Sequence, residues 1–544
     1  MARAVALAAA LAVSLLAVSG AGGAATHQTP KRGGTLDILA GAEPACLSVI
    51  ISPCKDAFAP FVNGVIEGAF KQASDLSWRE RLVSKVDYTT KPPFTLTYHI
   101  RPDARWSDGV PVSARDFVFT YETRLRYPEF PEDDPYRTQI QSVRRLDGKT
   151  VRVTLRSRYA FWRALFRHVL PEHALRGEEL EKVWLDRIDN PKTGRAIGNG
   201  PFLVGDWDRG KQLELVRNPR YSGKQKAYLA RIVFRWSVDP AQIAALFRDG
   251  SADVAQYQYV PPIVSALRSV PGVKLRFEPD SPGWEHLDFR LGPGGHPALR
   301  GSTPNSKLVR RAIAYGIDRV AMAREYISEA GARVRPLDSA ILRSGSRGYR
   351  PNWSGYRHRP AEAHRLLQQA GCRRGSDRIY SCAGERLTLR FVGRGGRLQP
   401  LERLQAQLRT VGIDVRPTVA FGLGHDQILM AGAFDATLFA WFGQGSEGPE
   451  SGKNLYGCGG DQNYMGYCQR LVTANLDQAN RILDADRRAI VLNRADRQLA
   501  LDVPTIPLYE IWSMTAYRPD VKNFANGSSF HDPTWNAENW WLDD

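Results

Sequence analysis

Six cysteines are the residues whose type and spacing could most directly carry chemistry. They form three local pairs, separated by eight, ten and ten positions: Cys46 and Cys54, Cys372 and Cys382, Cys458 and Cys468. A zinc site would need a C-x-x-C spacing or histidines close by, and the sequence has neither around these cysteines. In an exported chain, an even number of closely paired cysteines indicates three disulfides, each worth about 2 to 3 kcal/mol.

The N-terminus has the pattern of a secretory signal. Arg3 is followed by an apolar stretch at 4–18 and by small residues up to Ala25, so we expect residues 1–25 to be a signal peptide with cleavage after Ala25. Whether it is cleaved or kept as an anchor stays open. Because the first cysteine is Cys46, a lipid anchor on a cysteine directly after the apolar stretch is not expected. No later segment is long and apolar enough to span a bilayer. We therefore expect an extracytoplasmic protein, in the periplasm or at the outer face of the cell membrane.

The sequence motifs of common enzyme sites are incomplete. There is no H-E-x-x-H, and the nucleophile motif G-x-S-x-G fails around Ser446 because Gln444 occupies the first glycine position. The stretch at Gly452 lacks the earlier glycine and the hydroxyl residue of a phosphate loop, and the stretch at Gly393 lacks the third glycine of a dinucleotide motif. Two carboxylates brought together by the fold could still cleave a glycan or a peptide. A secreted hydrolase acting on peptides or glycans is therefore the alternative function.

Length and charge limit the class of protein. A chain of 544 residues is too long for one hydrophobic core, so we expect two or three domains. The net charge of +17 is spread along the chain and not gathered in one arm or stripe, which argues against a nucleic-acid partner. A positive surface would suit anionic membranes or acidic wall polymers. An arginine-rich genome would produce the same composition.

A β-hairpin is the clearest local structure that the sequence predicts. Two short runs at 202–207 and 212–216 flank Asp208-Arg209-Gly210, and the second run alternates apolar and polar side chains. The hairpin follows Gly200, where a glycine would allow another backbone to approach closely.

Further patterns predict helices and a parallel pair of strands. Ser113, with Asp116 three residues later, is typical of a capped helix start. A strand at 387–392, a helix at 400–411 and a strand at 413–415 follow in β-α-β order, which predicts a mainly parallel sheet in this region.

Several stretches of the sequence resemble one known family. They are GGTLDI at 33–38, RPDARWSDGVPVSARDFVFTYE at 101–122, NGPFLVGDWDRGKQLELVRNPRY at 199–221 and VRRAIAYGIDRVAM at 309–322. Together they resemble family-5 extracellular solute-binding proteins, the oligopeptide- and dipeptide-binding subunits of ABC importers. The resemblance implies an α/β fold of the periplasmic-binding-protein type (type II, a three-lobed Venus flytrap), with mixed sheets and flanking helices. It implies that residues 26–70, 198–283 and 500–544 form lobe I, 71–197 lobe II, and 284–499 lobe III.

The resemblance also implies a ligand-binding strand and loop at 434–444. Trp441 matches an aromatic position where an indole can stack on the ligand, and Phe442 follows it. Gln444 stands where peptide binders usually place an aspartate that holds the ligand's ammonium group, and a neutral amide lacks the charge for such a bond. Peptides, sugars, opines and nickel chelates therefore all stay open as ligands. The alternative is that Trp441 belongs to the core and Gln444 to an ordinary loop.

Five more residues are predicted to line the ligand cleft on the same resemblance. Asn463 and Tyr464 lie in a loop similar to one in the family, with the alternative that they only shape the cysteine loop. Arg290 could pair with a carboxylate or phosphate on the ligand, with a plain surface role as the alternative. Trp284 marks the position at which the chain is expected to cross into lobe III. Glu43 follows the first strand, in a turn that faces the ligand cleft in members of the family.

The function implied by the resemblance is binding without catalysis. Closure of the lobes around a peptide or another small solute would present a closed form to the membrane permease subunits of an ABC importer. We expect no cofactor, no metal site, no nucleic-acid partner, and a monomer.

Overall fold

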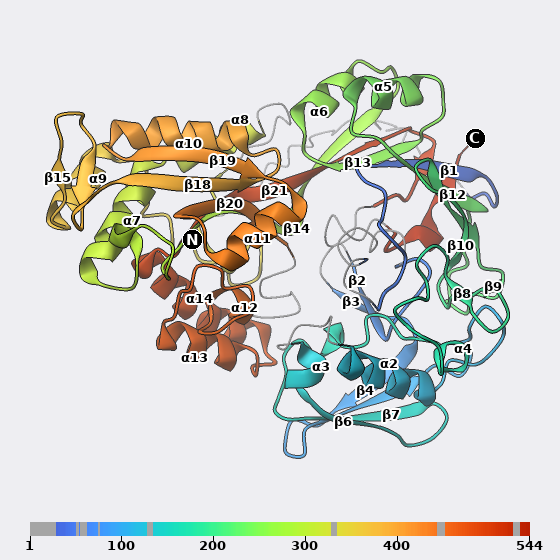
Figure 1. Ribbon diagram of the computed structural model, residues 1–544. Helices are drawn as coiled ribbons and strands as arrows, with labels where there is room; N and C mark the ends of the chain where they lie inside the picture. Colours follow the sequence, from blue (N-terminus) through green and yellow to red (C-terminus); the bar gives the residue numbers. More distant parts are fainter. Residues whose placement is uncertain are drawn as a thin grey trace, which may run out of the picture.

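The computed structural model describes residues 29–50, 54, 63–73, 77–127, 134–327, 335–442, 452–525 and 534–543. The expected signal at 1–25 and Gln444 lie outside these residues. The described chain is a mixed α/β protein in which two large parts, at the left and right of Figure 1, are connected by long strands. Within the described ranges, no helix combines the length and the apolar composition needed to cross a membrane.

A ten-stranded mixed sheet runs through both parts (Figure 1). Its strand order is β10 (Phe202–Asp208), β11 (Gln212–Arg217), β12 (Arg231–Trp236), β1 (Thr35–Ala40), β13 (Val254–Gln258), β21 (Thr505–Tyr517), β14 (Lys274–Phe289), β20 (Ala436–Trp441), β18 (Thr388–Arg394) and β19 (Asp414–Ala420). The two longest strands, β14 and β21, pair antiparallel along both of their halves. On β21, only the second half pairs with β13, and on β14, only the second half pairs with β20. The shared strands therefore carry the chain from one part to the other.

Three bodies can be defined by their elements. The β1 body holds β1, β10, β11, β12 and β13 with α5 (Pro240–Arg248) and α6 (Pro261–Arg268). The β4–β7 body holds the antiparallel strands β4 (Val83–Tyr88), β5 (Thr95–Ile100), β7 (Thr150–Leu155) and β6 (Ile140–Arg145), with α2 (Ala114–Arg126), α3 (Pro135–Thr138) and α4 (Glu172–Leu175). The β18–β20 body holds β18, β19 and β20 with α7 (Pro304–Gly316), α8 (Arg319–Tyr326), α9 (Pro360–Gln369), α10 (Leu398–Thr410), α11 (Gly422–Ala431), α12 (Lys453–Tyr456), α13 (Arg470–Ala479) and α14 (Ala485–Asp502). The boundaries expected for lobes I, II and III stay a prediction.

Small sheets complete the described structure. They are β2 (Phe70–Gln72) with β3 (Trp78–Glu80), β8 (Asp189–Asn190) with β9 (Arg195–Ala196), β22 (Val521–Lys522) with β23 (Trp541–Leu542), and the three strands β15 (Arg373–Arg374), β16 (Tyr380–Cys382) and β17 (Glu385–Arg386).

The cores show which bodies are joined most closely. One continuous core includes Ile38 of β1, Tyr98 of β5 and Phe117 of α2, so the β1 body and the β4–β7 body share their buried side chains. A second core, with Leu404 of α10 and Leu438 of β20 among its members, belongs to the β18–β20 body. Because a shared core resists relative movement, the β18–β20 body is the unit best able to move against the other two.

The local predictions from the sequence are confirmed at several elements. Strands β10 and β11 form the expected antiparallel hairpin. Helix α2 begins with a capping box in which Ser113 Oγ accepts from the Arg115 N–H at 3.2 Å and Asp116 Oδ2 accepts from the Ser113 N–H at 2.7 Å. Strands β18 and β19 are parallel and are connected by α10, as the β-α-β order predicts.

The junction before the hairpin is tightly packed. Asn199 is fully buried, accepts the Glu67 N–H at 2.6 Å and donates to the Glu67 carbonyl at 3.2 Å. A Cβ at Gly200 would lie 2.4 Å from the backbone oxygen of Gly64, so glycine is required by this close approach. The expected role of Gly200 is confirmed.

All three predicted disulfides are present. Cys46 is bonded to Cys54, Cys372 to Cys382, and Cys458 to Cys468, and no cysteine is free within the described ranges. The last bond closes the loop that carries Asn463 and Tyr464.

Candidate ligand-binding site

The neighbouring strands β14 and β20 carry a group of aromatic side chains on one face. In the antiparallel pair of β14 and β20, Trp284 stands opposite Trp441 and His286 opposite Phe439. Opposed residues of an antiparallel pair share a face of the sheet, and so do residues two positions apart on one strand. The register therefore gathers four rings into one patch, which we call the β14–β20 aromatic wall: Trp284, His286, Phe439 and Trp441.

Trp441 lies at the centre of a row of parallel rings. Its ring is nearly parallel to that of His286, with a centroid distance of 5.9 Å and an interplanar angle of 10°, and to that of Tyr464, at 6.2 Å and 13°. The Phe439 ring meets it edge-on at 4.8 Å. Trp441 is half-buried, and its Nε1–H has no hydrogen-bond partner in the described part of the chain. The indole is thus held in place by its neighbours while its polar group is left unused.

His286 is the buried member of this row. Its side chain is fully buried, and the Phe439 ring lies edge-on at 4.5 Å. Its Nε2 lies 3.3 Å from Asp288 Oδ2, yet neither ring nitrogen has a hydrogen-bond partner among the residues described. Buried polar atoms normally find partners, and groups of unpaired ones are features that a bound molecule or ordered water would satisfy. The sequence did not single out His286, although its position two residues after Trp284 places it on the same face of a strand.

A loop closed by a disulfide brings Tyr464 to the wall. Asn463 donates to the carbonyl oxygens of Gly457 at 2.8 Å and Tyr467 at 2.6 Å, and its Oδ1 accepts from the Tyr467 N–H at 3.1 Å. These bonds occupy both polar atoms of the Asn463 side chain and hold the loop in its shape. Tyr464 in turn stacks on Trp441, so the loop presents a ring to the wall.

Arg290 also holds this loop. Its Nη1 donates to the Tyr464 carbonyl at 2.6 Å, and its Nε donates to the Pro293 carbonyl at 2.9 Å. Burial lowers the pKa of the Arg290 guanidinium. The side chain therefore joins the end of β14 to the loop, and its bonds run to backbone oxygens.

The remaining predicted residues lie elsewhere or are only partly described. Glu43 accepts from the Trp207 indole N–H at 2.8 Å and from the Gly210 N–H at 2.9 Å, so it binds the turn of the β10–β11 hairpin in the β1 body. Phe442 follows Trp441 and is half-buried, and Gln444 lies beyond the described ranges. The structure thus brings together Trp284, Trp441, Tyr464, Asn463 and Arg290, while Glu43 contacts a different body.

Helix α11 supports the wall from the side. His425 is fully buried on it, with Nε2 at 3.2 Å from Thr437 Oγ1 of β20 and the Phe439 ring edge-on at 5.6 Å. Burial, followed by the charge of Arg394, lowers the pKa of His425 to about 4, while Asp426 opposes this shift and Arg397 adds to it. The imidazole is therefore neutral at pH 7 and serves as a packed side chain.

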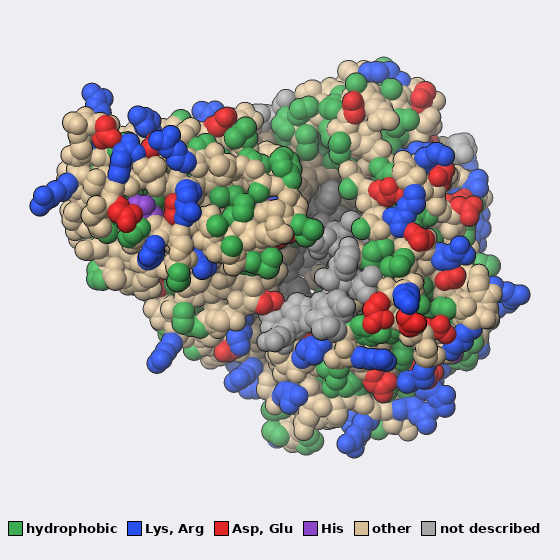
Figure 2. All heavy atoms as spheres, viewed as in Figure 1, with side chains coloured by type: hydrophobic (Ala, Val, Ile, Leu, Met, Phe, Trp, Pro, Cys, Tyr) green, Lys and Arg blue, Asp and Glu red, His purple; other side chains and the backbone are tan. Residues whose placement is uncertain are grey.

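The surface is hollowed between the bodies. Figure 2 shows the surface hollowed between the left side, formed by the β18–β20 body, and the right side, formed by the other two bodies. In Figure 1, β14 and β20 lie at the edge of the β18–β20 body that borders this hollow. Among the residues that flank or belong to α11, Phe421, Leu423 and Met430 expose 73%, 79% and 70% of their surface.

Comparison with known proteins gives a consistent result. Residues 78–463 match the family model described as bacterial extracellular solute-binding proteins, family 5. The oligopeptide-binding protein OppA of Mycobacterium bovis is 26% identical over 452 residues, which cover 81% of this chain and 73% of that protein. The periplasmic oligopeptide-binding protein OppA of Escherichia coli strain K12 is 21% identical over 458 residues, covering 79% of this chain and 78% of that protein.

Two solved structures show the same fold. The periplasmic EDTA-binding protein EppA superimposes with a TM-score of 0.84 at 20% identity, covering 95% of this chain and 98% of that chain. The oligopeptide-binding protein AppA from Bacillus subtilis, in complex with a nonapeptide, superimposes with a TM-score of 0.76 at 18% identity, covering 95% and 100%. The expected periplasmic-binding-protein fold is confirmed by these likenesses.

Proposed function

This chain belongs to family 5 of the bacterial extracellular solute-binding proteins, and on that premise we propose that it is the substrate-binding subunit of an ABC importer. It captures a peptide or a similar small solute between the β18–β20 body and the other two bodies, and delivers it to the membrane permease subunits. Export by the N-terminal signal and action as a monomer belong to the same proposal.

The observation that carries this proposal is the β14–β20 aromatic wall. Trp441 is half-buried, aligned by His286 and Tyr464, and has a buried N–H without a partner among the described residues. Solute sites are typically preformed apolar surfaces with a few polar groups that orient the ligand. Rings that are already fixed lose little entropy when a ligand stacks on them, so such a wall favours binding.

Peptides are the first ligand class that we propose. The relatives from Mycobacterium bovis and Escherichia coli are named for oligopeptides, which supports this choice. Gln444 in place of an acidic residue argues against a ligand held mainly by an ammonium group. Sugars, opines and metal chelates remain the other ligands to be tested.

No bond is made or broken in this mechanism. The relatives reported above are binding proteins by name, and none of them favours the hydrolase alternative. Closure around the ligand would lower its dissociation rate and create the surface that the permease recognises.

Native mass spectrometry of protein purified from its own host tests the proposal. We expect a population of bound peptides or of one small solute, which unfolding releases and which rebinds to the emptied protein. Incubation of the same protein with peptide and glycan pools is the second arm. Hydrolysis that is lost on substitution of one acidic residue, with no ligand retained, would decide for the hydrolase.

A further inference from the structure

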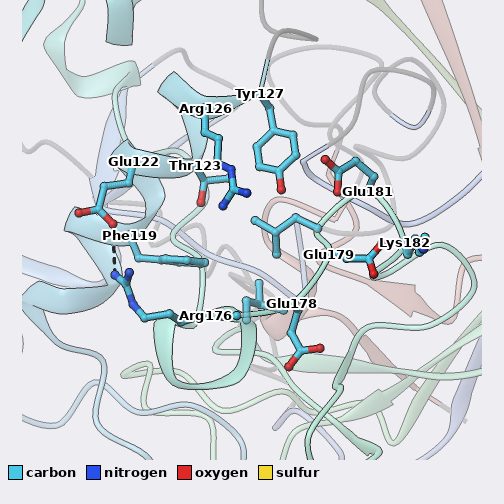
Figure 3. Close-up of a pocket in the computed structure, with 13 residues that line it drawn as sticks. Phe119, Glu122, Thr123, Arg126, Tyr127, Arg176, Glu178, Glu179, Glu181 and Lys182 are labelled. Atoms are coloured by element: carbon cyan, nitrogen blue, oxygen red, sulfur yellow. Dashed lines mark hydrogen bonds and ion pairs between the residues drawn. The ribbon is translucent and has the colours of Figure 1, made fainter.

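A separate cavity of about 630 Å³ lies in the β4–β7 body, away from the aromatic wall (Figure 3). It lies between the C-terminal half of α2 and the segment 175–182 at and after the end of α4. None of its lining residues comes from β14, β20 or the cysteine loop. Its volume falls within the range of about 300 to 1,000 Å³ that small-molecule sites occupy.

The floor of the cavity is apolar. Phe119 and Tyr127 from α2 and its end, and Leu175 and Leu180 from the opposite segment, are all buried in the fold and line the space. Figure 3 shows the rings of Phe119 and Tyr127 on two sides of the cavity. Such a floor would remove the side chain of a hydrophobic ligand from water and so favour its binding.

Part of the charge around the rim is already paired. Arg176 binds Glu172 at 2.6 Å and Glu122 at 3.2 Å, and its guanidinium lies 5.1 Å from the Phe119 ring centre. Lys182 binds Glu179 at 2.6 Å. These groups are occupied with one another, so they leave the recognition of a ligand to the other charged residues of the rim.

Three charged groups on the rim are not paired in this way. Arg126 has its guanidinium 5.9 Å from the Tyr127 ring and forms no ion pair with a described residue, and Glu178 likewise forms none. Glu181 accepts from the Tyr127 hydroxyl, and burial first, then the charge of Glu181, raises the pKa of Tyr127. In Figure 3, Arg126 and Glu181 lie on either side of the Tyr127 ring. One cation and two carboxylates therefore border an apolar floor.

We propose that this cavity is a second binding site, for a small zwitterion with an apolar body, of the class of an amino acid with a large hydrophobic side chain. Arg126 binds the carboxylate, Glu181 binds the ammonium group, and the side chain lies on Phe119 and Leu180. A simple anion would meet two carboxylates here, and a simple cation would meet Arg126. The zwitterion is the charge pattern that satisfies both signs.

Calorimetric titration of the full chain with L-leucine tests the site. We expect saturable binding that Arg126→Gln and Glu181→Gln each weaken at least about tenfold. Arg115→Gln, which removes an exposed arginine from α2 outside the cavity, is the matched control and should leave binding unchanged. Trp441→Ala should also leave it unchanged, so failure of this site and failure of the proposed importer function are distinguishable.

Leucine analogues give a second arm that needs no variant. Leucinamide lacks the carboxylate and N-acetyl-leucine lacks the ammonium group, and we expect each to bind the wild-type chain at least about tenfold more weakly than leucine. Equal binding of either analogue, no leucine binding at all, or leucine binding that neither substitution weakens would overturn the proposal.

Discussion

At the scale of single residues, Trp441 is the side chain that we expect to contact the ligand. Its ring is aligned by His286 and Tyr464 before any ligand arrives. The ring supplies both an apolar face and an N–H donor, and its loss would remove both without disturbing the cysteine loop, which Asn463 and Arg290 hold independently.

We therefore predict that Trp441→Ala lowers the affinity for the main ligand about tenfold to a hundredfold. Stacking and a donated hydrogen bond are together worth about 1.5 to 3 kcal/mol. Titration with the ligand identified by co-purification measures this. Tyr315→Ala, a half-buried ring of α7 outside the wall, is the matched control and should leave affinity intact. Unchanged affinity in Trp441→Ala would place the cleft elsewhere.

His425 gives a prediction about pH. Its pKa of about 4 in the folded protein lies below the value of about 6.5 in the unfolded chain. Above pH 6.5 the stabilisation from the neutral, buried ring is fully present. As the pH falls from 6.5 to 4, the unfolded state takes up the proton first, and about 2 to 3 kcal/mol of stability is lost.

The measurement compares wild type with His425→Gln, whose amide can still reach Thr437, by urea unfolding at several pH values. The difference between the two stability curves should shrink on acidification through this window, because carboxylate effects are common to both proteins. Parallel curves between pH 7 and pH 4 would show that the ring is not held neutral.

At the scale of elements, the disulfide loop at 458–468 is the part in which we expect stability and ligand binding to be linked. The bond between Cys458 and Cys468 constrains the segment that carries Tyr464, and Asn463 fixes its interior. The bond between Cys372 and Cys382 closes a segment of the same length, which includes β15 and β16. The two bonds therefore form a matched pair with different surroundings.

We predict that the double substitutions Cys458→Ser/Cys468→Ser and Cys372→Ser/Cys382→Ser each lower stability by about 2 to 3 kcal/mol, since the loops close equal lengths of chain. Only the first double substitution should lower the affinity for the main ligand, by about three- to tenfold, because Tyr464 would no longer be held in position. Urea unfolding and ligand titration measure the two effects. If both variants bound the ligand equally well, the loop would have no part in the site.

At the scale of the whole molecule, the arrangement of cores predicts how the chain closes. The β1 and β4–β7 bodies share one core, whereas the β18–β20 body has its own and is connected through β14 and β21. The β18–β20 body also touches the β4–β7 body, where the Ala160 N–H donates to the Asn480 carbonyl at 2.7 Å and Arg488 lies 5.2 Å from the Phe161 ring centre. Movement should therefore bend the crossing strands and make or break these contacts.

We predict that small-angle scattering shows a smaller radius of gyration with bound ligand than without it, because closure brings separated masses together. Leucine, which we place in the cavity of the β4–β7 body, should cause no such compaction and serves as the control. Identical scattering curves with and without the main ligand would contradict closure.

The sequence alone determined the family, the three disulfides, the hairpin, the capped start of α2 and the β18-α10-β19 unit. These features depend on residues that are close together in the chain, where spacing and chemistry suffice. Trp441 was identified as a candidate ligand-binding residue only through a sequence motif that resembles a known family. Its partner His286 was not, because a histidine in a strand carries no signal of what will stand opposite it.

Only the tertiary structure decided the rest of the site. The pairing of β14 with β20 joins segments far apart in the chain, and a shift of one residue in this pairing would have placed Trp441 and His286 on opposite faces of the sheet. The fold likewise directed Glu43 to the hairpin turn and Arg290 to backbone oxygens. It also placed Arg126 and Glu181 around one cavity. Local sequence fixes elements, while register and packing between distant segments decide which side chains meet.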